Sequence, residues 1–411
     1  MIITLRSKFQ EKPKVRMHIA HYLFLLFWVL KPFYFGQSGT MQVADLVFVA
    51  SFGASIVVQR GRIIINHRDL VLLAFIGCVF VINGIYAAVY QRIDFLFSSA
   101  YYLYNFLVVI TIRQFLDNRT FLKALLWASA LALFTQLAVL FLGTGRYMWG
   151  IYRFMGTFND PNQFAFSMFT SFLIVYVLSS YFKEMEKTRK KFLVVLIFIL
   201  SVYFVTQGSS TGMLLGIGTF VIAFFALFIA SEKTPFFVFL RVVTLMLVLI
   251  LILYAIFVGF STDGLDNSVG SGSFLVFRLF EKVGKVESGG VMALLEDRAI
   301  DKVFENPVYM LFGSGEGGHT RFPGPAYEVH STLLGILFYY GIFPFLLLCV
   351  WMRRNLKHMS RMLVPAYLAL LIESFTLANQ RQPAFWILIV LGSLAYANHR
   401  ELRKYRIVTT L

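Results

Sequence analysis

Long apolar runs, separated by short polar segments, follow one another along almost the whole chain. A helix needs about 20 predominantly apolar residues to cross the hydrocarbon core of a bilayer. By this measure the sequence predicts twelve membrane-spanning helices, which makes the chain an all-α, polytopic integral membrane protein. The predicted spans are residues 17–36, 43–59, 69–90, 95–112, 121–142, 163–182, 192–206, 212–231, 236–260, 329–350, 362–378 and 384–398.

The positions of lysine and arginine predict how these spans are oriented. Basic residues favour the cytoplasmic ends of membrane helices. If the amino terminus lies inside, the cytoplasmic segments hold 26 of the 37 Lys and Arg residues, ten lie outside, and Lys31 falls within the first span. The sequence therefore predicts an N-in/C-in topology, with both termini in the cytoplasm.

Composition agrees with this class and excludes several others. Hydrophobic residues make up 58% of the 411 residues and charged residues only 14%, with a mean hydropathy of +0.73. The net charge of +16 does not indicate nucleic-acid binding, because the basic residues punctuate the apolar runs rather than gather on one soluble face. Cys78 and Cys349 lie in separate apolar runs, so neither a disulfide framework nor a cysteine metal site is predicted.

No internal repeat divides the chain, and residues 1–411 are predicted to form a single membrane domain. Its one large insertion is an external loop over 261–328, between the ninth and tenth spans. The first half of this loop is rich in Gly, Ser and Asp. The second half has residues at helical spacing, which predicts a short helix lying over the membrane surface. These residues are Val291, Leu294, Leu295, Arg298, Lys302 and Val303.

Polar side chains gather in five segments that this topology places on the external face. They are "RFMGTFNDPNQF" at 153–164, "QGSSTG" at 207–212, "GSGEGG" at 313–318, "YEVHSTLLG" at 327–335 and "NQRQP" at 379–383. External arginines work against the orientation rule, which indicates that some of them serve a ligand. A guanidinium binds phosphate through two parallel hydrogen bonds, so a phosphate-bearing ligand is the natural candidate.

Each segment also has a purely structural interpretation. Asn159, Asp160 and Pro161 are typical of a turn that leads into a helix, and Arg298 stands close to acids with which it can form an ion pair. "GSGEGG" follows no recognisable strand and lacks the Gly-Lys-Ser or Gly-Lys-Thr ending of a nucleotide loop, so a flexible turn is predicted. His330 has no histidine or carboxylate at i+3 or i+4, so no metal site is predicted and the residue can be merely interfacial.

The order of these motifs resembles the O-antigen polymerase and ligase superfamily of bacterial polysaccharide enzymes (Wzy-like). Three blocks carry the resemblance: "RFMGTFNDPNQFA" ahead of a span, "GSSTGMLLG" at the mouth of another, and the late external loop from "EDRAIDKVFENPVYMLFGSGEG" to "VHSTLLGILFYYGIFPFLLL". Together with the predicted spans, they cover most of the chain. The resemblance implies a GT-C-like membrane fold and no cofactor.

The resemblance also implies roles for individual residues. The family's arginine ahead of Gly-x-Phe-x-x-Pro-Asn falls on Arg153, its external-loop arginine on Arg298, and its helix-opening histidine on His330. Many members read Ser-Arg-Gly where residues 209–212 of this chain read Ser-Ser-Thr-Gly, so a phosphate contact is expected from elsewhere, with Arg381 as a substitute. "VHST" replaces the more usual His-Asn pair, which leaves the role of the residue after the histidine open.

The implied reaction transfers a glycan from a polyprenyl carrier, such as undecaprenyl diphosphate, to a sugar hydroxyl. No metal ion is expected: Arg153 and Arg298 stabilise the diphosphate leaving group, and His330 takes the proton from the acceptor. The three polar residues of the Asn-Asp-Pro-Asn turn either orient sugar hydroxyls or hold Arg153. The predicted substrate-binding residues are Asn159, Asp160, Asn162, Ser209, Ser210, Thr211 and Arg381.

These expectations favour a polymerase of lipid-linked repeat units for a capsule, an exopolysaccharide or an O-antigen. Such a polymerase lies among the lipids of the bacterial cytoplasmic (inner) membrane, with its site on the external or periplasmic face, and a chain-length regulator is its expected protein partner. A ligase of the same superfamily differs only in its acceptor. A flippase is expected to carry charged residues in mid-span, and the acids placed within spans are Asp45, near an end, and Glu373. A purely structural scaffold is the remaining alternative.

Overall fold

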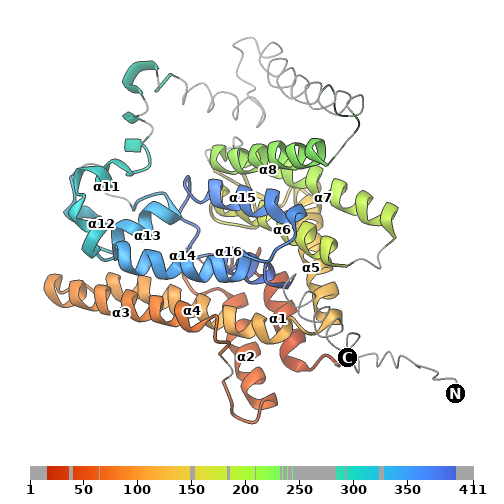
Figure 1. Cartoon of the computed structure of the whole chain (residues 1–411), viewed down its shortest axis with the longest axis horizontal. Helices are drawn as coiled ribbons and strands as arrows, with labels where there is room; N and C mark the ends of the chain where they lie inside the picture. Colours follow the sequence, from red (N-terminus) through yellow and green to blue (C-terminus); the bar gives the residue numbers. More distant parts are fainter. Residues whose placement is uncertain are drawn as a thin grey trace, which may run out of the picture.

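The computed structural model describes most of the chain. The described residues are 16–36, 40–63, 65–148, 153–182, 186–208, 210–231, 234, 238, 243, 284–285, 287–290, 292–293, 295–323 and 328–394. Apart from single residues, the predicted ninth span over 236–260 lies outside them, as do Ser209 and the external loop before residue 284. Within the described residues the chain is mostly helical, with one two-stranded hairpin (Figure 1).

Long helices dominate the described residues up to 231. Helices α3 to α8 are each long and apolar enough to cross a membrane, and they are the six such helices in the described part of the chain. Helices α1 and α2 are apolar but shorter. The elements are α1 (Ile19–Leu30), α2 (Val43–Val58), α3 (Leu70–Tyr90), α4 (Asp94–Phe115), α5 (Arg119–Phe141), β1 (Arg146–Met148), β2 (Arg153–Gly156), α6 (Pro161–Tyr181), α7 (Lys187–Gln207) and α8 (Thr211–Ala230).

Shorter helices make up the C-terminal part. They are α11 (Asp301–Glu305), α12 (Val308–Phe312), α13 (Thr332–Tyr340), α14 (Ile342–Leu356), α15 (Val364–Glu373) and α16 (Pro383–Leu391). The predicted span over 329–350 is therefore two helices, because the chain breaks between them at Gly341. The helix predicted over 291–307 is interrupted at Ala299, whose φ is 52°, and its Val291 and Leu294 lie outside the described residues. The chain is thus an all-α membrane protein with six long spanning helices among its described residues, and the count of twelve stays a prediction.

A glycine-rich loop over 313–318 explains how the chain can break at Gly341. Gly341 has a φ of +78°, and a Cβ atom there would lie 2.5 Å from the carbonyl oxygen of Leu311. Two N–H groups of the loop bond to carbonyls at the end of α13: Ser314 donates to Phe338 at 3.0 Å, and Gly315 donates to Tyr339 at 2.8 Å. A helix end buried in a membrane protein needs such partners for its last carbonyls. The loop supplies them.

A buried ion pair ties several helices together at one end of the bundle. Arg113, in the last turn of α4, donates to both carboxylate oxygens of Asp69, at 2.9 and 2.8 Å. Its guanidinium also donates to Asn355 at 2.7 Å and to Ser393 at 2.8 Å, and Trp351 donates to Asp69 at 2.9 Å. The start of α3 and the ends of α4, α14 and α16 therefore lie together.

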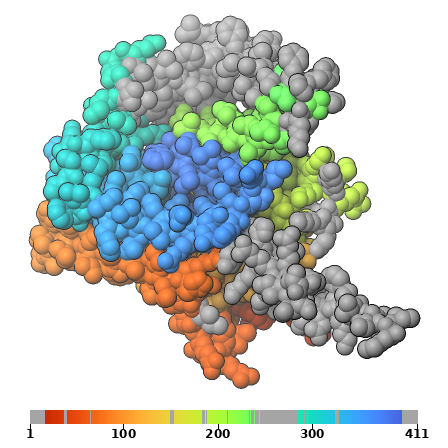
Figure 2. Space-filling view, in the orientation of Figure 1, coloured from red at the N-terminus to blue at the C-terminus, as the bar shows by residue number. Residues whose placement is uncertain are grey.

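Helix α6 lies at the centre of the fold. Within its membrane-length window 83% of the residues are buried, against 22% for α8 and 28% for α3. Figure 2 shows the C-terminal helices (blue) lying between α3 and α4 (orange) on one side and α8 (green) on the other. The outward faces of the outer helices carry large apolar side chains, such as Val81 and Ile222, as expected for surfaces in contact with lipid.

Candidate functional site

The starts of four helices meet at the end of the bundle opposite the Asp69–Arg113 pair. They are α6, α8, α13 and α16, and the loop over 374–382, between α15 and α16, joins them. Thr332, the first residue of α13, donates its N–H to the carbonyls of Ser374 and Leu377, at 2.8 and 2.9 Å. A Cβ atom on Gly212, in the first turn of α8, would lie 2.4 Å from the hydroxyl of Thr376. Helix amino termini carry partial positive charge and can bind anions, although the carboxyl ends of α7 and α15 lie at the same end of the bundle.

Arg153 joins the start of α6 to the end of α7. It lies on β2, which pairs antiparallel with β1, and it is only 5% exposed. Its Nε donates to the carbonyl of Gly208 at 3.0 Å, and its Nη2 donates to Oδ1 of Asn162 at 3.1 Å. Asn162 was predicted either to orient sugar hydroxyls or to hold Arg153, and in the structure it holds Arg153.

The rest of the Asn-Asp-Pro-Asn turn builds local structure. Asp160 caps α6, because its Oδ1 accepts the N–H groups of Asn162 and Gln163, at 2.8 and 2.9 Å. Asn159 accepts a hydrogen bond from Arg146 and donates one to the carbonyl of Gly36. The capping interpretation of this turn is confirmed, and it leaves the carboxylate of Asp160 at the site.

His330 and Arg298 lie side by side. The N–H of His330 donates to the carbonyl of Arg298 at 2.9 Å, and the guanidinium of Arg298 donates to the carbonyl of Thr376. Burial lowers the pKa of His330, while the charge of Glu328 and, more weakly, those of Asp160 and Asp297 raise it. A histidine whose pKa lies below its usual 6.5 is mostly neutral at pH 7, as a base must be.

The turn before α8 holds a buried hydroxyl. Ser210 is 2% exposed, and its Oγ has no hydrogen-bond partner among the described residues. Thr211, the first residue of α8, is half-buried, and Ser209 lies outside the described residues. A buried hydroxyl without a partner is costly, so the side chain of Ser210 is suited to bind a ligand or a water molecule.

Arg381 is engaged by two carboxylates that the sequence analysis did not single out. Its guanidinium lies 2.7 Å from Oε1 of Glu316 and 2.6 Å from Oε2 of Glu328, over the ring of Tyr101. Glu316 is fully buried and also accepts the hydroxyl of Tyr340 at 2.7 Å. A phosphate that binds Arg381, as the sequence analysis expects, has to compete with both carboxylates. The only sequence signal for Glu328 is its place two residues before His330.

The loop over 313–318 is neither a flexible turn nor a phosphate cradle. Its residues are buried, and besides the two N–H groups bonded to α13, Glu316 donates its N–H to Asn83 at 2.8 Å. Gly318 donates its N–H to the carboxylate of Asp94 at 2.7 Å. The loop is therefore a buried and bonded segment rather than the predicted flexible turn. Four of its N–H groups already bind protein acceptors, which agrees with the prediction that it is not a nucleotide loop.

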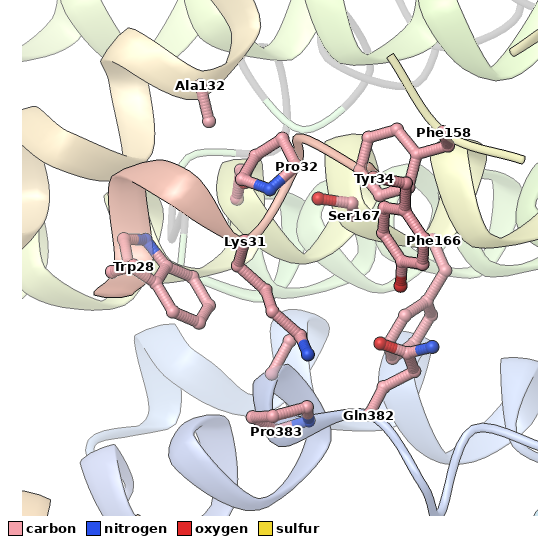
Figure 3. A pocket seen from close by; sticks show the side chains of 12 residues that line it. Trp28, Lys31, Pro32, Tyr34, Ala132, Phe158, Phe166, Ser167, Gln382 and Pro383 are labelled. Carbon is pink, nitrogen blue, oxygen red and sulfur yellow. The ribbon is translucent and has the colours of Figure 1, made fainter. Parts of the chain in front are cut away.

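A small cavity lies beside the site, between the end of α1, α6 and the start of α16 (Figure 3). Lys31 lines it and forms an ion pair with Asp45 at 2.7 Å, and Tyr104 donates to the same carboxylate at 2.7 Å. Figure 3 shows the hydroxyl of Tyr34 and the amide of Gln382 pointing toward one another at one side of the cavity. Asp45, the acid placed in the second predicted span, is thus paired in the first turn of α2.

Sequence comparisons with known proteins do not identify this site. Among the described residues, no three His, Cys, Asp or Glu side chains gather closely enough to hold a metal ion. No model of a known protein family matches the chain, and no curated protein is similar to it in sequence.

Proposed function

We propose that the protein is a membrane glycosyltransferase that polymerises polyprenyl-diphosphate-linked oligosaccharide repeat units. The observation that carries this proposal is the position of His330, bonded to the backbone of Arg298 where four helix amino termini meet. Burial lowers the pKa of this histidine, which favours its neutral form. The proposal includes twelve spans, an N-in/C-in topology, and a site at the outer face of the bacterial cytoplasmic membrane. The order of the sequence motifs supports it, since those of the Wzy-like superfamily come in the same order.

The reaction places opposite electrostatic demands on the two ends of the scissile bond. The C–O bond between the sugar and the diphosphate breaks, and its electron pair stays on the diphosphate. Arg298 and the helix amino termini stabilise that charge, and one well-placed donor in such a site contributes about 3 to 4 kcal/mol. The acceptor oxygen attacks the anomeric carbon while its proton passes to His330.

Arg153 has a different role from Arg298 in this proposal. Its guanidinium is buried and bonded to Gly208 and Asn162, so it ties the start of α6 to the end of α7, just before α8. Its charge adds to the positive potential at those starts. Arg298, half-buried and next to His330, is the arginine that meets the leaving group.

A ligase and a flippase are the competing functions. Among the six spanning helices the only acidic residue is Asp94, at the first position of α4, and the buried Glu373, placed within a predicted span, is the last residue of α15. A transporter of charged lipids usually carries ionisable residues in mid-span, so this distribution favours an enzyme that works at one face. A ligase shares the chemistry, and only the acceptor separates it from a polymerase.

His330→Gln provides the test. The variant retains a side chain of similar size outside α13, so it is expected to insert and accumulate normally. Transfer is expected to fall by a factor of about 100 or more, because the acceptor proton has no base. The measurement is polymer length in a strain that lacks the chromosomal copy, normalised to the amount of membrane protein.

The matched control is His67→Gln, which changes an exposed histidine between α2 and α3, at the other end of the bundle. Wild-type chain length in His330→Gln would refute the base role. A wild-type protein that joins glycan to a lipid core, and lengthens no repeat unit, would identify a ligase.

A further inference from the structure

Arg381 is held in place by a carboxylate in the core. Its Nε and Nη2 donate to Oε1 of Glu316 at 3.2 and 2.7 Å, and Oε2 of Glu316 accepts the hydroxyl of Tyr340 at 2.7 Å. Glu316 is 0% exposed. The carbonyl of Arg381 also accepts a hydrogen bond from Asn105 at 3.2 Å, so both the backbone and the guanidinium of Arg381 are fixed.

A second and more exposed carboxylate, that of Glu328, contacts the same guanidinium. Its Oε2 lies 2.6 Å from Nη2 of Arg381, the nitrogen that also binds Glu316. The side chains of Arg381 and Glu328 are 29% and 25% exposed. Nη1 of Arg381 and Oε1 of Glu328 have no hydrogen-bond partner among the described residues. A donor and an acceptor are therefore available to a ligand at one ion pair.

The charge of this cluster disfavours a phosphate. One guanidinium contacts two carboxylates, so the negative charges of Arg381, Glu316 and Glu328 outnumber the positive one. Glu328 also acts on His319 and His330, but the pKa of each histidine is lowered, mainly by burial, which favours its neutral form. A phosphate bound here would add like charge to a partly buried site that already has a negative excess.

Sugar hydroxyl groups match the cluster better. A carboxylate only accepts hydrogen bonds and a guanidinium only donates them, whereas each hydroxyl group does both. Two neighbouring hydroxyls of a sugar ring can therefore bind Oε1 of Glu328 and Nη1 of Arg381 without adding charge. The ring centre of Tyr101, 5.5 Å from the guanidinium carbon of Arg381, places apolar surface beside them for the C–H groups of a sugar.

We propose that Arg381 and Glu328 form a subsite for the hydroxyl groups of an uncharged saccharide, with Glu316 holding Arg381 in place. That this saccharide is the acceptor of glycan transfer rests on the proposed function, whereas its binding does not. The inference changes the role of Arg381, which the sequence analysis assigned to phosphate.

The position of the subsite suits an acceptor. Glu328 precedes the proposed base, His330, by two residues, and the buried Val329 between them donates its N–H to the hydroxyl of Tyr339 at 2.7 Å. The loop that carries Arg381 also supplies the carbonyl that binds Arg298. The proposed site thus has a cationic part, with Arg298 for the diphosphate, and a part with excess negative charge for the neutral sugar that gives its proton to His330.

The first experiment measures two probes on one variant. Glu328→Gln retains the buried Arg381–Glu316 pair, so it is expected to fold. The probes are inorganic pyrophosphate and an array of uncharged bacterial oligosaccharides, bound to purified protein in lipid nanodiscs. The wild type is expected to bind at least one saccharide. Glu328→Gln is expected to bind it about five- to tenfold more weakly, because a neutral amide replaces a charged acceptor.

Pyrophosphate provides the contrasting measurement. Its affinity is expected to change by about twofold or less in Glu328→Gln, because only a distant charge is removed. Arg381→Lys retains a charge for Glu316 but loses the planar fork, so it is expected to weaken saccharide binding as well. Glu305→Gln, at an exposed carboxylate on α11, is the control and is expected to bind both probes as the wild type does.

The two affinities decide between a saccharide and a phosphate. If Glu328 merely shields Arg381 from phosphate, its removal strengthens pyrophosphate binding severalfold, and that result overturns the proposal. An array on which the wild type binds no uncharged saccharide overturns it too, as does saccharide binding that is unchanged in Glu328→Gln.

A second experiment tests the acceptor role. The saccharide that binds is supplied free, with labelled lipid-linked repeat units as donor, and transfer is followed as label on the free saccharide. In Glu328→Gln the KM for the saccharide is expected to rise about five- to tenfold, with little change in the KM for the donor. A change in the KM for the donor alone overturns the acceptor role. Saccharide binding that depends on Glu328, in a protein that transfers no glycan, supports the subsite and refutes the proposed function.

Discussion

Asp160 illustrates how one residue serves both the fold and the site. Its carboxylate caps α6 by accepting two N–H groups, and a negative charge at a helix amino terminus is itself stabilising. The same charge acts on His330 and raises its pKa. The residue that begins the central helix therefore also adjusts the proposed base, and substitution can separate the two effects.

Asp160→Ala and Asp160→Asn are expected to differ. Alanine removes the oxygen that accepts the two N–H groups, so the free energy of unfolding in detergent is expected to fall by about 1 kcal/mol. A lower melting temperature reports this loss. Asparagine retains the acceptor and removes only the charge, so stability stays nearly constant. The pKa of His330 then falls, and because the base acts when deprotonated, the acidic limb of the activity profile moves to lower pH. Equal melting temperatures for the two variants would contradict this.

The glycine-rich loop over 313–318 likewise serves more than one element of the fold. Its N–H groups complete the end of α13, and Arg321 anchors it to the turn between α3 and α4. The guanidinium carbon of Arg321 lies 4.9 Å from the ring centre of Tyr86 and 5.1 Å from that of Phe95, and its Nη2 donates to the carbonyl of Gly315 at 3.0 Å. The broken helix and the loop are therefore one structural unit.

Gly341→Ala is expected to destabilise this unit by more than about 1 kcal/mol, because alanine disfavours the positive φ and its Cβ meets the carbonyl of Leu311. The loss is measured as a lower melting temperature and less folded protein in the membrane. Gly77→Ala is the control: it lies in α3, where an added Cβ has no atom within 4 Å. An unchanged melting temperature in Gly341→Ala would show that the loop does not depend on the helix break at Gly341.

The long helices were predictable and the short ones were not. The predicted spans over 69–90 and 212–231 match α3 and α8 to within one residue at each end, because an apolar run that faces lipid is readable from hydropathy alone. The break inside 329–350 depends on a loop that completes the helix end from outside it. Likewise, Arg153, Arg298 and His330 could be singled out because they lie in sequence motifs. The contact of Arg381 with Glu316 could not be predicted, because it joins residues 65 apart and leaves no local pattern in the sequence.

The whole molecule has two chemically distinct ends. One holds the Asp69–Arg113 pair, which binds its tryptophan, asparagine and serine partners. The other holds His330, Arg298 and Arg381, with side chains that are only half-buried. This difference favours placing the chemistry at the second end, which the proposed topology puts outside.

Single cysteines test that sidedness. After Cys78 and Cys349 are replaced, Thr144→Cys, at an exposed turn after α5, is expected to react with an impermeant maleimide added to intact spheroplasts. Ile63→Cys, 53% exposed between α2 and α3, is expected to react only after the membrane is opened. The reverse pattern would place the site in the cytoplasm and exclude a flipped lipid-linked donor.

The hydrogen bonds accepted by residues 374–377 determine when, during synthesis, the proposed site can be completed. Thr332 reaches the carbonyls of Ser374 and Leu377, and Arg298 reaches that of Thr376. During translation, His330 and Arg298 therefore leave the ribosome before the groups that hold them have been synthesised. A nascent chain therefore contains His330 and Arg298 before the backbone carbonyls of residues 374–377 exist to hold this part of the site. Under the proposed function, no glycan is transferred until α15 and α16 have been inserted.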